Sequence, residues 1–129
     1  MSYRQEPRYI TSVLVEERDN SVIITWGLGD VVPGGADHFE YGVDYYGPDG
    51  NGGKRFDVGF FDEPSAHVFE WSSNTNANYD ASSVVPIESG LVVFYRDASI
   101  GLPKVGTIQA YLSVHGQDVQ TGFPVTLVR

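Results

Sequence analysis

With 129 residues, no cysteine and a net charge of −9, the chain has the size of one domain and excludes several kinds of site. The absence of cysteine removes disulfides, thiolate metal sites and cysteine nucleophiles together. Because an acidic surface repels phosphate groups, we expect no binding to nucleic acid or to a membrane surface.

Neither a membrane span nor a secretory signal is predicted. No apolar run is long enough to cross a bilayer, and the polar start lacks the apolar segment of a signal peptide. We expect residues 1–7 to form a polar N-terminal arm and residues 8–129 to form a single β-sandwich domain. The hydrophobic content of 41% is enough for a packed core and predicts a soluble chain, without indicating a compartment.

The predicted strands alternate between apolar and polar residues, with the period of two that is typical of half-buried β-strands. They cover 9–15, 22–26, 38–46, 55–60, 67–71, 91–96, 107–115 and 119–128. Turn residues separate them, with a hairpin loop at 47–53 and a longer polar loop at 72–83. No window of helical length carries an uninterrupted apolar stripe. We therefore predict an all-β fold, an antiparallel two-sheet β-sandwich of about seven to nine strands.

The same alternation predicts which side chains face the core. On the first strand, one face is expected to carry Tyr9, Thr11, Val13 and Val15. Trp26 is expected to be the most buried large residue. The other expected core residues are Val13, Ile24, Tyr41, Val43, Val58, Ile108, Leu112 and Val125.

A family resemblance lies in residues 13–60. Trp26 closes the second strand, a Gly-rich loop follows, and then come Tyr41-x-Val43-x-Tyr45, a turn and the run 54–58. This pattern resembles strands B, C and C′ of a fibronectin type III or immunoglobulin-like β-sandwich domain. In the second half the chain departs from that family, because Tyr111 is out of phase with the apolar positions of its strand. The resemblance implies a spacer, scaffold or binding module.

Charge predicts the register of the hairpin formed by 38–46 and 55–60. One register places Asp44 opposite Asp57, and another places Asp44 opposite Arg55 and Tyr46 opposite Gly53. Like charges directly opposite one another destabilise a strand pair, whereas opposite charges contribute about 0.2–1 kcal/mol. We therefore expect the register that pairs Asp44 with Arg55.

The chain carries no motif that predicts catalysis, a cofactor or a metal. Asp49-Gly-Asn51 resembles a fragment of a calcium loop, but the remaining ligands do not follow at the required spacing. His38, His67 and His115 are not spaced as metal ligands, and no serine lies in a nucleophile elbow. His67 is expected to be half-buried on a strand face that it shares with Phe69 and Trp71. We interpret the chain as non-enzymatic.

The strand 91–95 is apolar on both faces, although only one face can point into the sandwich. Its other face is therefore either covered by the chain's own loop 72–83 and by Pro64 and Pro86, or is an interface. The residues predicted for such an interface are Phe61, Trp71, Val92 and Phe94.

Aromatic residues make up 13% of the chain, more than one core needs. A second hypothesis is therefore a carbohydrate-binding module in which exposed rings stack on sugars. The residues predicted for that role are Tyr46, Phe61, Trp71 and Tyr79. Our first hypothesis remains a non-enzymatic structural or protein-interaction module, in a larger assembly such as a virion or a surface complex. It predicts a protein partner or self-association.

Overall fold

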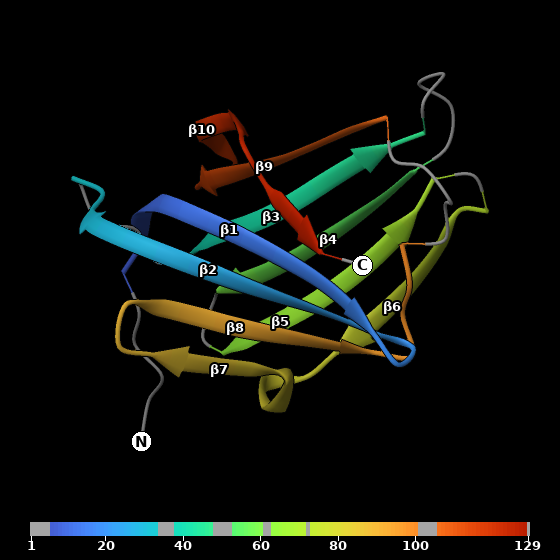
Figure 1. Cartoon of the computed structure of the whole chain (residues 1–129). Coiled ribbons are helices and arrows are strands. Elements are labelled where there is room, and N and C mark those ends of the chain that lie inside the picture. The colour runs from blue at the N-terminus through green and yellow to red at the C-terminus, as the bar shows by residue number, and fades with distance from the viewer. Residues whose placement is uncertain are drawn as a thin grey trace.

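The computed structural model describes residues 6–33, 38–47, 53–60, 63–71, 73–100 and 106–128, and these form a two-sheet, all-β sandwich (Figure 1). The strands are β1 (Arg8–Arg18), β2 (Ser21–Val31), β3 (Phe39–Tyr46), β4 (Gly53–Phe60), β5 (Pro64–Glu70), β6 (Thr75–Tyr79), β7 (Val84–Ile87), β8 (Gly90–Arg96), β9 (Thr107–Val114), β10 (Gln117–Phe123) and β11 (Thr126–Val128). The five-stranded sheet has the order β11-β1-β2-β8-β7 and the six-stranded sheet the order β10-β9-β3-β4-β5-β6.

The core lies between the two sheets and is built from alternate residues of the long strands. On β2, Val22, Ile24 and Trp26 are fully buried while the residues between them are only half-buried. Trp26 is the largest fully buried side chain, as predicted. Two of the expected core residues, Ile108 and Val125, are only partly buried against the core, and the other six besides Trp26 lie inside it.

The all-β fold class is confirmed, but the number of strands was underestimated. Eleven strands are present in the described part of the chain, and the single helical element there is a one-turn 3-10 helix at Ala81–Ser83. The predicted loop 72–83 contains β6, which forms the edge of the six-stranded sheet against β5. Because an edge strand is bonded on one side only and this one is mostly exposed, its polar residues gave no apolar alternation. The run 119–128 divides into β10 and β11, and β11 pairs in parallel with β1.

A β-bulge corrects the predicted face of the first strand. The register of β1 against β2 shifts on both sides of Ile10, so Tyr9 and Thr11 point to solvent and Ile10 is buried in their place. The extra residue reverses the alternation of side chains between Ile10 and Val13. Gln120 of β10 satisfies the displaced backbone: its Oε1 accepts from Ile10 N–H at 2.7 Å, and its Nε2 donates to Ile10 C=O at 3.3 Å.

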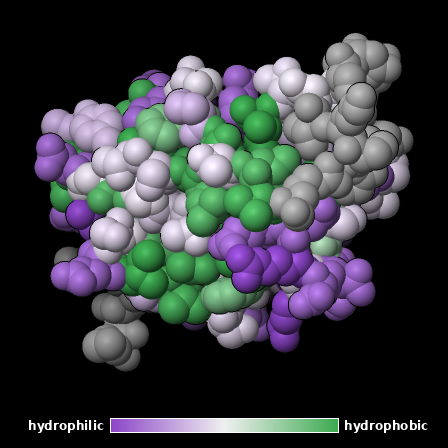
Figure 2. Space-filling model, viewed as in Figure 1, coloured by the Kyte–Doolittle hydropathy of each residue, from purple (hydrophilic) through white to green (hydrophobic). Residues whose placement is uncertain are grey.

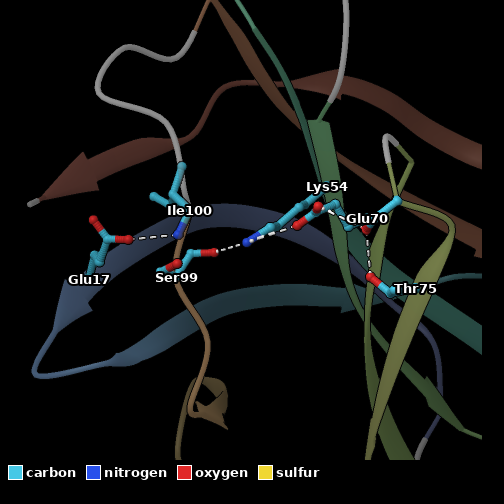
Figure 3. A network of polar contacts seen from close by, with 7 residues as sticks. Glu17, Lys54, Glu70, Thr75, Ser99 and Ile100 are labelled. Atoms are coloured by element: carbon cyan, nitrogen blue, oxygen red, sulfur yellow. Dashed lines mark hydrogen bonds and ion pairs between the residues drawn. The ribbon is translucent and has the colours of Figure 1, made fainter.

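One end of the sandwich is closed by polar contacts around Lys54 (Figure 3). The Lys54 side chain occupies an inward position on β4, only 15% of it is exposed, and its Nζ donates to Ser99 C=O at 2.6 Å and lies 3.5 Å from Glu70 Oε1. Beside it, Glu17 accepts from Ile100 N–H at 2.6 Å. These contacts hold the segment that leaves β8, so that Ile100 is buried against the core.

The structure describes only the last two residues of the expected N-terminal arm. Residues 1–5 of the expected N-terminal arm lie outside the described residues, while Pro7 is buried and its C=O accepts from Val32 N–H at 2.8 Å. Among the described residues, no helix is long and apolar enough to cross a membrane.

Candidate functional site

The outer face of the six-stranded sheet carries a network of charged side chains. β3 and β4 adopt the predicted register, with Asp44 opposite Arg55 and Tyr46 opposite Gly53. Arg55 Nε and Nη2 donate to the two carboxylate oxygens of Asp44 at 2.6 and 3.0 Å. The Asp44 side chain is only 10% exposed, and its hydrogen bonds raise the pKa of Arg55 further above the usual arginine value. A bidentate pair of this kind fixes both side chains.

Tyr111 joins this network by lying over a glycine. A Cβ on Gly42 would be 2.3 Å from the Tyr111 ring, so only glycine leaves room for the ring against the sheet. The Arg55 guanidinium lies 4.9 Å from the centroid of the same ring, and the Tyr111 hydroxyl donates to Glu40. Burial, followed by the hydrogen bond to Glu40, raises the pKa of Tyr111 well above its usual range. The out-of-phase Tyr111 of the sequence is therefore an outer-face residue.

Asp57 and His67 form a second pair on the same face. His67 Nδ1 lies 2.7 Å from Asp57 Oδ1, and only 15% of the Asp57 side chain is exposed. Burial raises the pKa of Asp57 to about 6, against the lowering effect of the hydrogen bond from His67. His67 is half-buried, as the sequence predicted.

The aromatic residues predicted for sugar stacking are only partly brought together. Tyr46 and Trp71 stack with ring centroids 5.1 Å apart and an interplanar angle of 5°, next to Gly53. Tyr79 instead points inward, where its ring meets the buried Tyr95 at a centroid distance of 5.6 Å, so it is not part of an exposed ring platform. Phe61 lies outside the described residues.

A groove of about 410 Å3 runs between the charged network and the edge hairpin of β9 and β10. Its lining includes Gln109 and Tyr111 of β9 and Asp118 and Thr121 of β10. The register shifts in β10 and the positive φ of 63° at Gly122 bend this strand away from a regular ladder beside the groove. The groove was not predicted from the sequence, because the bend in β10 depends on backbone geometry that no local sequence pattern indicates.

The outer face of the five-stranded sheet is apolar at its centre. Ile23 lies opposite Phe94, and Val92 lies between Thr25 and Val85. Phe94 is 38% exposed and Val92 is half-buried, whereas the alternate residues of β8 are buried in the core. Neighbouring outward residues are Leu14, Ile87 and Val128. Figure 2, which views this face, shows hydrophobic side chains gathered over β7 and β8 and again over β1 and β11.

Of the four predicted interface residues, Val92 and Phe94 lie on this apolar face, Trp71 lies on the opposite face of the sandwich, and Phe61 is outside the described residues. Cover by 72–83, one of the two alternatives for this face, is not seen in the described part of that segment, because β6 belongs to the other sheet. Asp49 and Asn51 of the calcium-like fragment also lie outside the described residues. Within the described part, no three His, Asp or Glu side chains are grouped to hold a metal ion.

Comparisons of the chain with protein-family models, curated proteins and solved structures gave no significant match. The proposed function therefore rests on the fold and on the two outer faces.

Proposed function

We propose that the chain is an immunoglobulin-like, non-enzymatic interaction module. Support for the fold assignment comes from the strand order: β1-β2-β8-β7 corresponds to strands A-B-E-D, and β10-β9-β3-β4-β5 to G-F-C-C′-C″ of that family. Trp26 on the strand equivalent to B matches the fibronectin type III pattern. In this assignment β6 and β11 are additions at the sheet edges.

The interaction surface in this proposal is the outer face of the five-stranded sheet. The observation that carries it is the exposure of Phe94, at 38%, on a strand flanked on this face by Ile23 of β2 and Val85 of β7. An antiparallel sheet with one face in water normally presents polar residues there. Val85 and Ile87, each 42% exposed, extend the patch to the edge strand β7. Contiguous exposed apolar surface of this kind marks a contact.

The partner we propose is a second copy of the chain. The charged residues of the face, Glu16, Arg18 and Arg96, are displaced toward the end of the strands where β1 turns into β2, and the centre is apolar. Depletion of charge at the centre is typical of homodimer interfaces, and two-fold dimers are the commonest oligomers. Five strands of about seven residues form a sheet face with a flat area on the order of 500 Å2, to which the protruding side chains add further surface. This approaches the roughly 800 Å2 per partner of a stable interface.

The test is the substitution Phe94→Asp, with Val119→Asp as the matched control. Val119 is also an exposed apolar strand residue, at 36%, but it lies on β10 in the other sheet. We expect light scattering coupled to size-exclusion chromatography to show a dimer for the wild type and for Val119→Asp. Phe94→Asp should raise the dissociation constant at least about tenfold, because a buried carboxylate without a partner is strongly unfavourable. Thermal unfolding should show that both variants remain folded.

A wild-type chain that stays monomeric at all concentrations would contradict self-association. Equal weakening of the dimer by both substitutions would contradict the assignment of the surface. If the proposal holds, the domain serves as a subunit of a larger assembly, such as a virion or a surface complex, and this face joins it to its neighbour.

A further inference from the structure

We propose that the groove on the outer face of the six-stranded sheet binds a neutral saccharide. The groove lies on the opposite side of the sandwich from the apolar face, so this inference does not depend on self-association. Its 410 Å3 is within the range of small-ligand sites, but its lining is polar where most such sites are apolar. The ligand is therefore polar as well.

The charges in the groove favour a ligand that carries hydroxyl groups. The Asp44 carboxylate and the Arg55 guanidinium lie side by side, and 41% of the Arg55 side chain is exposed. A ligand that spans such a pair must donate to the carboxylate and accept from the guanidinium. A hydroxyl group does both, whereas an ammonium ion only donates and would lie beside a like charge. Adjacent hydroxyls on a sugar ring match this alternation.

Polar groups in the lining that have no hydrogen-bond partner among the described residues extend the same chemistry. The amide of Gln109 can donate and accept, as can the hydroxyl of Thr121, and both line the groove. Glu40 and Asp118 supply carboxylate oxygens that accept from ligand hydroxyls. The charged groups are held in place by their own contacts, Asp44 by Arg55 and Glu40 by Tyr111, so little side-chain freedom is lost on binding.

An aromatic pair on the same sheet face, two residues along the strands from groove positions, suits the apolar face of a sugar ring. Tyr46 follows Asp44 by two residues on the same face of β3, and Trp71 follows Phe69, the residue opposite Arg55, by two residues along the neighbouring strand. One side of each ring is covered by the other ring of the stack, and both side chains are half-buried. The remaining exposed ring surface is available for the C–H groups of a saccharide.

The experiment is a titration with a panel of neutral mono- and oligosaccharides built from glucose, galactose, mannose and N-acetylglucosamine, followed by amide chemical shifts. Gln109→Ala is the test variant and Gln117→Ala the matched control, because Gln117 lies on the exposed start of β10, where it does not line the groove. We expect at least one saccharide to shift the amides of β3, β4 and β9. Gln109→Ala should weaken its binding about fivefold, the effect of one lost hydrogen bond, and Gln117→Ala should leave it unchanged.

Trp71 provides an independent readout. Trp26 is fully buried in the core, so a change in tryptophan fluorescence on titration reports on Trp71. Failure of every saccharide to bind overturns the proposal, and so does saccharide binding that Gln109→Ala leaves unchanged. Binding of spermidine, tested as a cationic probe, in place of any saccharide assigns the groove to cations instead. Phe94→Asp should retain saccharide binding, which separates this test from that of the dimer.

Discussion

Asp57 shows how burial on an outer sheet face makes a single residue sensitive to pH. Its pKa rises from 3.8 to about 6 because burial disfavours the carboxylate more than His67 stabilises it. The other charged or titratable groups that act on it are Glu40, Arg55, Tyr95 and Tyr111. Between pH 3.8 and about 6 the folded chain keeps a proton on Asp57 that the unfolded chain has lost. The free energy of unfolding therefore decreases as the pH rises through this window.

Asp57→Asn should remove this dependence. An asparagine stays neutral at every pH and can still accept a hydrogen bond from His67, so the variant gains stability relative to the wild type as the pH rises from about 4 to about 7. The relative change should reach up to about 3 kcal/mol at about 1.4 kcal/mol per pKa unit. Chemical denaturation of both chains at the two pH values measures it. A constant difference between wild type and Asp57→Asn would contradict the assignment.

Two tyrosines of the core act as links between the sheets. The Tyr41 hydroxyl accepts from Arg8 N–H at 2.9 Å and donates to Arg8 C=O at 3.0 Å, which joins β3 to the start of β1. Burial raises the pKa of Tyr41 to about 12, against the lowering effect of Arg8. The Tyr95 hydroxyl donates to Asp57 C=O at 2.7 Å and joins β8 to β4. Each ring fills the core while its hydroxyl forms a hydrogen bond to the backbone of the facing sheet.

At the scale of one element, the bulge in β1 depends on a side chain far away in the sequence. Gln120 bonds both backbone groups of Ile10, where the register of β1 against β2 shifts. Gln120→Ala should lower the free energy of unfolding by about 2 kcal/mol, because it leaves a buried N–H and C=O unsatisfied. Gln117→Ala on the same strand is the exposed control and should change stability by less than about 0.5 kcal/mol. Urea denaturation distinguishes the two, and equal effects would show that the bulge does not need Gln120.

The predicted elements show where sequence patterns suffice. The register of β3 and β4 followed from charge and alternation, because a slip of two residues would have paired Asp44 with Asp57, and a slip of one would have reversed the faces. The core residue Trp26 followed from alternation over a long strand. The faces at the start of β1 did not follow from alternation, because the bulge is stabilised by Gln120, which is 110 residues away in the sequence. The strand β6 did not follow from alternation either, since its side chains are mostly polar and exposed.

The same contrast applies to the two outer faces. The apolar face was visible in the sequence because Val92 and Phe94 interrupt the expected polar positions of β8. In the charged network, the pair of Asp44 and Arg55 was predicted, but the contacts of Tyr111 with Gly42 and Glu40 were not. In the sequence, the one indication that Tyr111 lies on the outer face is that it is out of phase with the apolar positions of its strand. Its position over a glycine required the register of β3 against β9.

For the whole molecule, the sandwich separates two kinds of surface. The five-stranded sheet presents apolar residues outward, and the six-stranded sheet presents charged and aromatic ones. Because the sheets are held together by the core, by the tyrosine links and by the contacts of Lys54 and Glu17 at one end, the two outer faces are fixed on opposite sides (Figures 1 and 3). A dimer formed through the apolar face therefore leaves both grooves open and directed away from each other.

The net charge of −9 makes the salt dependence of association a test of this arrangement. Two chains of like charge repel each other, and added salt screens that repulsion over a Debye length of about 10 Å at 0.1 M. Contacts through the apolar face are not weakened by salt. We therefore expect the dimer dissociation constant to decrease as NaCl rises from about 20 mM to about 300 mM, as measured by sedimentation equilibrium. Association that weakens over this range would show that pairs of opposite charge, and not the apolar residues around Phe94, hold the two copies together.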